Sequence, residues 1–326
     1  MKVLVTGALG NVGSNVTLEL LRQGHQVTCF DLETPANVKK AKQVDHKVEI
    51  QWGNLTDRAS VERAVKGHDV VMHIAGILPP LSEAKPDLTK KVNVEGTQLL
   101  LDVMAHANPV PRLIFTSSIS IFGDTLALPP PRKVTDPIHP TDHYSQSKAT
   151  CEDLIQKSGL KFVICRLSAT PPVSMGGGEM DPYMFEMPVN LRVEYVHPGD
   201  VARALVNAIS CDDAWGKTFL IGGGPRCQLM AKDFLGRLLD AIGIGALPDE
   251  AYGPGPYYLD WLDTTESQRM LKFQQVTYDD YVQSMVKGLG AKRYIIKLMR
   301  PMIRKKLLKS SKYWQAFQAN QKEARK

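Results

Sequence analysis

The feature that most constrains the fold is the first stretch of the chain, MKVLVTGALGNVGSNVTLELLRQG. Residues 1–6 form the unbroken apolar run that is typical of a parallel strand covered on both faces. Gly7, Gly10 and Gly13 follow at spacings of three and precede an amphipathic helix. Such a loop turns the backbone sharply and points the N-terminus of a helix at a phosphate group. The spacing is G-x-x-G-x-x-G rather than G-x-G-x-x-G, yet its place between a strand and a helix favours a nucleotide-binding loop over a purely structural turn.

Further strand-like runs alternate with helical segments along the chain. Strands are expected at residues 25–30, 69–74, 112–116 and 162–167, and one long helix at 87–107. This alternation predicts the α/β class, with a Rossmann-like, doubly wound parallel sheet covered on both faces. A cofactor would lie across the carboxyl ends of the strands, where the loops carry the chemistry.

The second strand ends in Asp31, about twenty residues beyond the glycines. Its carboxylate can accept hydrogen bonds from the ribose hydroxyls of an adenosine and would repel a 2′-phosphate. Asp31 therefore favours NAD over NADP as the cofactor. Lys39 and Lys40 follow closely enough to leave NADP open as the less favoured alternative.

Tyr144 is followed four residues later by Lys148, in the segment HYSQSK. A free phenol ionises near pH ~10, so it accepts protons poorly at neutral pH. On a helix these two residues share a face, and we expect the ammonium group to lower the pKa of the phenol through its opposite charge. The pair could then move a proton, although the same spacing also occurs on ordinary solvated helix faces.

Several segments in order, TGALGNVG, GNLTD, HIAG, VNVEGT, FTSSISIFG and TDPIHPTDHYSQSK, resemble the landmarks of one enzyme family. The chain resembles the extended short-chain dehydrogenase/reductases of the NAD-dependent epimerase/dehydratase type over roughly its first 225 residues. The resemblance implies an enzyme with NAD as cofactor, a small-molecule substrate and a homodimer built from helix pairs.

The resemblance also implies which residues contact the cofactor. In the GNLTD segment Asn54 replaces the acid that contacts adenine in the family, so this contact is expected through the amide and the adjacent Leu55 backbone. The complete predicted set is Gly7, Leu9, Gly10, Asn11, Val12, Gly13, Asp31, Asn54, Leu55, Ile74, Ala75, Gly76, Ser117, Tyr144 and Lys148.

The catalytic residues that the resemblance implies are Ser118, Tyr144, Lys148 and Asn93. The Ser118 hydroxyl can donate to a substrate oxygen and accept from Tyr144, which would hold that oxygen in line with the cofactor. Successive strand residues point to opposite faces, so only one of Ser117 and Ser118 is expected to face the cofactor, and alignment on Gly123 selects Ser118. Lys148 would also donate to the nicotinamide ribose. Asn93 either helps to position Lys148 or serves as a helix-packing amide.

The chain is expected to divide into three parts. Residues 1–170 would form the NAD-binding Rossmann domain, to which residues 191–225 return. Residues 171–190 and 226–290 would form a substrate-binding lobe, and 291–326 a basic amphipathic C-terminal tail. The Met, Phe and Tyr content of residues 173–187 suggests an apolar pocket wall, although such clusters are also typical of plain core.

The substrate is constrained by a departure from the family at Arg166. The sequence there runs RLSATPPV, without the Asn that reaches the diphosphate in relatives that act on nucleotide sugars. We therefore favour hydride transfer between NAD and a less polar secondary alcohol or ketone. A nucleotide-sugar epimerase or dehydratase that retains NAD is the alternative, and a non-catalytic nucleotide-sensing protein is a third hypothesis.

Composition fits a soluble cytoplasmic enzyme, since 326 residues with 43% hydrophobic content can fill one large domain and a smaller lobe. The first strand starts at residue 1, which leaves no room for a signal peptide before it, and no apolar run approaches the ~18 residues of a membrane span. Five cysteines without a CxxC pair indicate neither a disulfide framework nor a zinc site. The histidines lack metal-ligand spacing, so no metal is expected.

Positive charge is concentrated at the C-terminus, because residues 292–326 contain twelve Lys or Arg and the single acid Glu323. This tail carries a net charge of +11, which leaves −5 on residues 1–291. Apolar side chains lie near one helical stripe of the tail, and Pro301 interrupts it: Ile295, Met299, Met302, Ile303 and Leu307. The pattern is compatible with packing on the protein or a second subunit, or with peripheral binding to an anionic membrane. Nucleic acid is not expected as a partner, because no recognition motif accompanies the charge.

Overall fold

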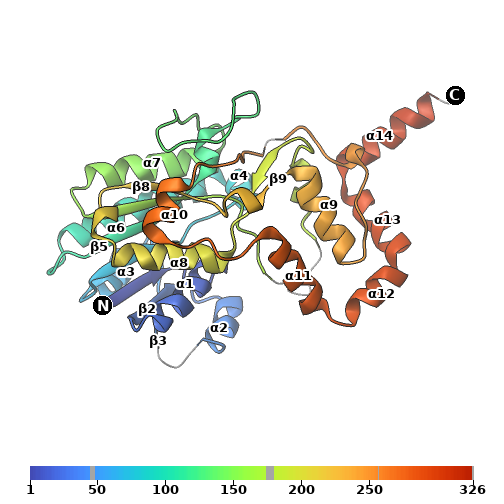
Figure 1. The fold of residues 1–326 in the computed structure, drawn as a ribbon. Coiled ribbons are helices and arrows are strands. Elements are labelled where there is room, and N and C mark those ends of the chain that lie inside the picture. The colour runs from blue at the N-terminus through green and yellow to red at the C-terminus, as the bar shows by residue number, and fades with distance from the viewer. Residues whose placement is uncertain (45–47, 174–179, 256, 325–326) are drawn as a thin grey trace.

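The computed structural model of the chain describes residues 1–44, 48–173, 180–255 and 257–324. Its centre is a parallel sheet of seven strands in the order β3-β2-β1-β4-β5-β6-β8 (Figure 1). The strands are β1 (Lys2–Thr6), β2 (Gln26–Asp31), β3 (Val48–Trp52), β4 (Val70–His73), β5 (Arg112–Ser118), β6 (Phe162–Leu167) and β8 (Thr218–Ile221). The predicted Rossmann-like fold is confirmed.

Helices cover both faces of the sheet. One apolar cluster joins it to α1 (Asn11–Arg22) and α8 (Pro198–Ile209), through side chains such as Val16 and Leu205. A second cluster covers the other face with α3 (Arg58–Val65), α6 (Gly96–Ala105) and α7 (His143–Lys157). This double cover explains why central strands such as β1 and β4 are largely apolar, whereas the edge strand β3 alternates apolar and polar residues.

The strand order reverses direction between β1 and β4, which are neighbours in the sheet although β2 and β3 separate them in the chain. At such a switch point the loops after two adjacent strands diverge and leave a crevice at the carboxyl ends. The loops that begin at Gly7 and Ile74 flank this crevice.

The segment expected as one helix over 87–107 is interrupted. It consists of α5 (Pro86–Thr89), a π-helical turn over Lys90–Glu95 and then α6. Periodicity alone did not reveal the π turn. Such turns insert one residue into an α-helix and occur frequently at functional sites.

The C-terminal half adds further helices and a small second sheet. They are α9 (Ala231–Ala241), α10 (Thr265–Leu271), α11 (Tyr278–Leu289) and the two-stranded antiparallel sheet of β7 (Arg192–Glu194) and β9 (Gln228–Met230). β8 joins the main sheet and α8 covers it, whereas β7 pairs with β9. Leu271 of α10 also packs against the sheet cluster. The expected division into domains stays a prediction.

The basic tail forms three short helices at the edge of the molecule, beyond α9 and α11 (Figure 1). They are α12 (Lys292–Leu298), α13 (Arg300–Ser310) and α14 (Lys312–Glu323), and Pro301 lies in the first turn of α13. The predicted apolar stripe is split: Ile303 and Leu307 pack against the core, whereas Ile295, Met299 and Met302 are exposed. The remaining short helices are α2 (Pro35–Ala41) and α4 (Leu81–Ala84). No helix among the described residues is long and apolar enough to cross a membrane.

Candidate active site

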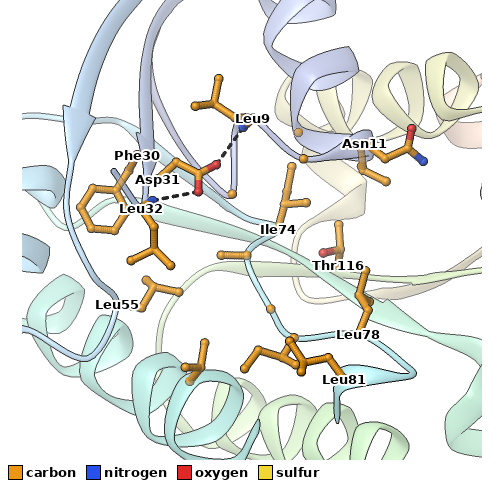
Figure 2. Close-up of a pocket in the computed structure, with 18 of the residues that line it drawn as sticks. Leu9, Asn11, Phe30, Asp31, Leu32, Leu55, Ile74, Leu78, Leu81 and Thr116 are labelled. Carbon is orange, nitrogen blue, oxygen red and sulfur yellow. Dashed lines mark hydrogen bonds between the residues drawn. The ribbon is translucent and has the colours of Figure 1, made fainter. Parts of the chain in front are cut away.

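A cavity of about 690 Å³ opens at the switch point of the sheet (Figure 2). Residues at the carboxyl ends of β1, β2, β4, β5 and β6 line it, as the parallel topology requires. Every residue predicted to contact the cofactor is part of this lining, from Gly7 in the glycine loop to Lys148 on α7. Its volume lies within the range of small-molecule sites.

The glycine loop is shaped for close approach of a ligand. Gly7 has a φ of +68°, and a Cβ there would lie 2.8 Å from the backbone of Ala75. A Cβ on Gly13 would collide with the Gly7 carbonyl oxygen, so neither position has room for a side chain. Within the described chain no side chain caps α1 at Gly10, and its first-turn N–H groups can therefore bind a phosphate.

Asp31 is held in place by the backbone around it. One carboxylate oxygen accepts from the Leu9 N–H at 2.9 Å, and the other accepts from the Leu32 N–H at 2.9 Å (Figure 2). Asn37 also donates to this carboxylate at 3.0 Å. These bonds fix the acid at the edge of the cavity next to the glycine loop, where a ribose would be expected.

The loops after β3 and β4 form the opposite sides of the cofactor region. Asn54 and Leu55 line the cavity, and the Asn54 amide oxygen accepts from the Thr56 N–H at 3.0 Å. The N–H groups of Ile74 and Ala75 donate to the Thr6 hydroxyl at 3.2 and 3.3 Å. The β4 loop is thus tied to the end of β1, which keeps the crevice open on that side.

Ser117 and Ser118 both line the cavity. The expectation that only one of their side chains faces the cofactor stays a prediction, and the alternation behind it agrees with their burial, since Ser117 is buried and Ser118 is partly exposed. Their hydroxyls differ accordingly. The Ser118 hydroxyl accepts from the Ser120 N–H at 3.2 Å and hydrogen-bonds Tyr144, whereas the Ser117 hydroxyl is buried without a partner among the described residues.

Tyr144 and Lys148 project from the first turns of α7. The helix starts at His143 because Asp142 and Ser145 form a capping box, in which Asp142 accepts from the Ser145 N–H at 2.6 Å. A second acid reinforces this start, since Glu83 on α4 accepts from the N–H groups of His143 and Tyr144, each at 3.1 Å. Sequence reasoning did not identify Glu83, because it lies 61 residues before Tyr144.

Lys148 is buried, and its Nζ donates to the Thr116 carbonyl oxygen at 2.7 Å. The Nζ lies 4.6 Å from the Phe115 ring centre and 5.9 Å from that of Tyr144. Burial lowers the pKa of Lys148 to about 8. The buried ammonium therefore loses its proton more easily than a surface lysine does.

The prediction that Lys148 lowers the pKa of Tyr144 was wrong for this structure. Burial raises the pKa of Tyr144 well above its ordinary value of 10.0, and the hydrogen bond from Ser118 offsets this only in part. The phenol is 9% exposed, and desolvation of the phenolate outweighs the charge of a lysine that also lies over Phe115. The phenol is therefore poised as a proton donor at neutral pH.

Asn93 is the predicted site residue that does not line the cavity. It lies in the π turn behind the wall and is buried. Its amide accepts from the Ile77 N–H at 2.7 Å and donates to the Ile77 carbonyl at 3.0 Å and to the Ser147 hydroxyl at 3.1 Å. Asn93 therefore links the loop after β4 to the helix that carries Lys148, which is a positioning arrangement.

The cavity is also lined by apolar side chains that sequence reasoning did not single out. Most come from residues 77–92, and Figure 2 shows Leu78 and Leu81 across the cavity from Leu9: Ile77, Leu78, Leu81, Leu88, Val92 and Leu167. The exposed fractions of Leu78, Leu81 and Leu88 are 58%, 46% and 41%. Leucines that stay this exposed beside a cavity are candidates for contact with an apolar ligand.

The expected apolar wall at residues 173–187 stays a prediction, and the described part of this segment shows the alternative of plain core for two of its side chains. Residues 174–179 lie outside the described chain, and neither residue 173 nor residues 180–187 line the cavity. Phe185 and Met187 are buried in core clusters instead. Arg166 forms a buried ion pair with Glu152 at 2.7 Å, so its guanidinium supports α7.

His73 is a structural histidine at the end of β4. It is buried, with both ring nitrogens hydrogen-bonded, to Thr6 at 2.8 Å and to Thr97 at 2.9 Å. Burial lowers its pKa to about 3, so the ring is neutral. Among the described residues no group of three or more His, Cys, Asp or Glu side chains could hold a metal ion.

Comparison with known proteins now places the chain in a family. Residues 3–171 match the family described as "NAD dependent epimerase/dehydratase family", and the chain belongs to it. The family that the sequence analysis named is thereby confirmed.

Two curated relatives show the range of reactions in the family. The chain is 28% identical over 192 residues to D-erythronate dehydrogenase of Cupriavidus necator, covering 55% of this chain and 57% of the relative. It is 32% identical over 173 residues to UDP-glucose 4-epimerase of Bos taurus, covering 48% of each. The chain spans about half the length of the curated relatives it matches.

A solved structure agrees over almost the whole chain. It is a short-chain dehydrogenase/reductase superfamily protein from Agrobacterium tumefaciens with bound NAD, similar with a TM-score of 0.72. The sequences are 22% identical, and the match covers 92% of this chain and 100% of the other. At this identity the likeness supports the fold.

Proposed function

We propose that the protein is an NAD-dependent oxidoreductase that interconverts a secondary alcohol and the corresponding ketone. The observation that carries the proposal is the convergence of Ser118 from β5 with Tyr144 and Lys148 from α7 on one cavity, which the glycine loop also lines. A hydrogen-bonding serine, a tyrosine and a lysine beside a nucleotide-binding loop form a proton-transfer site.

The residues around the glycine loop fit NAD. The side-chain-free surface at Gly7 and Gly13 admits a pyrophosphate, and the uncapped start of α1 offers it N–H donors. The fixed carboxylate of Asp31 suits a ribose with free hydroxyls. Lys40 lines the same region, but its Nζ donates to the Leu9 carbonyl at 2.9 Å, which favours NAD over NADP.

The protein residues supply positioning and the proton. NAD(H), when bound, supplies or accepts the hydride. Ser118 donates to the substrate oxygen and keeps it within reach of Tyr144. Tyr144 transfers its phenolic proton to that oxygen during reduction, and the Ser118 hydroxyl stabilises the phenolate that remains, while Lys148 would donate to the nicotinamide ribose. Tyr144 is protonated at neutral pH and can act as the proton donor of ketone reduction; in the reverse reaction its phenolate would accept the proton.

The cavity lining supports a less polar substrate. Apolar side chains of residues 77–92 flank the proposed reaction centre. Among the described residues that line the cavity the only basic ones are Lys40 and Lys148, and both donate to backbone carbonyls. Anionic ligands are usually bound by arginine side chains. The diphosphate of a nucleotide-sugar substrate would meet no arginine in this lining.

Purified protein tests the proposal directly. NADH consumption is measured with a panel of apolar cyclic and linear ketones, with UDP-sugars as the competing class. Reduction of apolar ketones that is lost in Tyr144→Phe supports the proposal. Retained NAD with sugar interconversion and no net redox change would establish the epimerase alternative, and cofactor binding without turnover would favour a nucleotide-sensing role.

The homodimer, the cytoplasmic location and the membrane contact of the tail stay proposals. Light scattering on the purified chain reads out the number of subunits. Fractionation of cells that express the chain reads out its location.

A further inference from the structure

The helices α12 and α13 expose large apolar side chains on the side that faces away from the protein. Ile296 of α12 and Ile303 and Leu307 of α13 pack against the cluster around α9, so the core-facing side of these helices is already covered. Five others remain in solvent: Tyr294, Ile295, Leu298, Met299 and Met302, exposed by 64%, 59%, 84%, 39% and 58%. We call these five residues the apolar corner. Contiguous exposed apolar patches on a soluble protein mark interaction sites.

A basic cavity of about 300 Å³ lies beside the apolar corner. Arg293, Lys297 and Arg300 line it at positions i, i+4 and i+7, and Tyr294 belongs both to its lining and to the corner. Within the described chain none of these three cations forms a salt bridge. Asp240 is the one acid of the lining, and its carboxylate accepts from the Ala246 N–H at 3.0 Å.

The floor of the basic cavity is built by a glycine loop between α9 and the segment before α10. Gly245 has a φ of +81°, and a Cβ there would overlap the Arg300 guanidinium. Arg304 fixes the loop, since its Nη1 donates to the carbonyl oxygens of Gly245 at 2.8 Å and Ala246 at 2.7 Å. The cations therefore gather over a backbone that is held in one conformation rather than being spread on a mobile tail.

We propose that this corner docks on an anionic phospholipid bilayer. Lipid phosphate groups would occupy the basic cavity, and the five apolar side chains would enter the interface beside it. A helix with cations next to outward-facing Leu, Met, Ile and Tyr side chains has the composition of interfacial membrane helices. The net charge of +11 on residues 292–326 adds attraction to an anionic surface.

The combination of cations and exposed apolar side chains favours a bilayer over a second copy of the chain or a nucleic acid. A second copy that docked through the same patch would bring its Arg293, Lys297 and Arg300 near the identical residues of the first. Nucleic acid would satisfy the cations but would leave the apolar corner in water. A bilayer with acidic headgroups satisfies both at once.

Vesicle co-sedimentation of the full chain tests the proposal. The probes are phosphatidylcholine vesicles with and without phosphatidylserine. We expect binding only to the anionic vesicles, weakening as salt rises. The triple variant Arg293→Gln, Lys297→Gln, Arg300→Gln should lose roughly 100-fold in partition coefficient, since each base near an anionic surface contributes about fivefold. Soluble glycerophosphoserine should compete weakly, because it lacks the apolar contact.

Matched variants separate the outcomes. The control Lys66→Gln, Lys133→Gln, Lys161→Gln removes the same charge from exposed positions elsewhere, and it should bind as the unmodified chain does. The double variant Leu298→Ser, Met302→Ser should weaken binding while the thermal unfolding temperature stays unchanged, since both side chains are exposed. Equal binding of the two triple variants, or equal binding to neutral vesicles, would overturn the proposal. A change of oligomeric state in the double variant without a change in vesicle binding would assign the corner to a second copy.

Discussion

The two walls of the main cavity differ in how they are built. The cofactor wall consists of backbone at strand ends, where Gly7, Gly13 and the anchored Asp31 leave almost no freedom. The proposed substrate wall consists of apolar side chains from residues 77–92, held through Asn93 and Glu83. The first is fixed by topology, and the second by side chains that can change without altering the sheet. The same scaffold can therefore keep its cofactor while its substrate varies.

The largest effect on turnover is expected from a substitution of Tyr144, which lies between the two walls. Tyr144→Phe removes the proton donor, and kcat should fall roughly 10²- to 10⁴-fold because general acid catalysis contributes about that much. NADH binding, measured by fluorescence titration, should change little. A variant that retained most of its turnover would show that another group moves the proton.

The free energy of unfolding should rise with pH because the pKa of Lys148 is lowered in the folded chain. Its pKa is about 8 in the folded chain against 10.5 for the free side chain, so between these values the unfolded chain binds a proton that the folded chain does not. The free energy of unfolding should therefore increase between pH 8 and pH 10, by roughly 2 kcal/mol. The raised pKa of Tyr144 acts in the opposite direction only above pH 10, since its unfolded value is 10.0.

Denaturant titrations at several pH values check this prediction. Lys148→Met should flatten the rise, whereas Lys161→Met, which removes an exposed lysine, should leave it intact. Parallel curves for the unmodified chain and Lys148→Met would contradict the assignment.

A single methyl group added at Gly13 in the cofactor wall should weaken the binding of NADH. Gly13→Ala places a Cβ against the Gly7 carbonyl oxygen, and the loop must shift. We expect the Kd for NADH to rise about tenfold or more, in keeping with ~1–3 kcal/mol for strain of this kind. Gly288→Ala is the matched control, because a Cβ there meets nothing within 4 Å.

The substrate wall should show a smaller and more selective response. Leu81→Ala should raise KM for an apolar ketone by roughly tenfold while the Kd for NADH stays the same, since a few methylene contacts are worth ~1–3 kcal/mol. Leu128→Ala alters a leucine of similar exposure that does not line the cavity and should leave KM unchanged. If the two variants behave alike, residues 77–92 do not contact the substrate.

The two walls were not equally predictable from the sequence. Gly7, Asp31, Ser118, Tyr144 and Lys148 follow strand ends or a helix start, and their spacing along the chain is enough to bring them to one edge of a parallel sheet. The order of the landmarks therefore predicted the fold and the cofactor wall.

What sequence reasoning missed depends on tertiary packing. Leu81 and Phe185 are both apolar, yet only Leu81 lines the cavity while Phe185 is buried in the core. The direction of the pKa shift of Tyr144 depends on how deeply its ring is buried, which helical spacing does not reveal. The sequence likewise does not show which residues of the apolar stripe in the tail are exposed. The structure shows it, because Ile303 and Leu307 pack against the core while the others remain in solvent.

The π turn over Lys90–Glu95 has a consequence for how this chain can diverge. A π turn holds one residue more than the α-helix that surrounds it, so deleting any single residue there would let the segment wind as a continuous α-helix. Asn93 would then swing away from Ile77 and Ser147, and the loop beneath the cofactor would lose its tether. Homologues should accordingly show constant length across this stretch even where its amino acids differ.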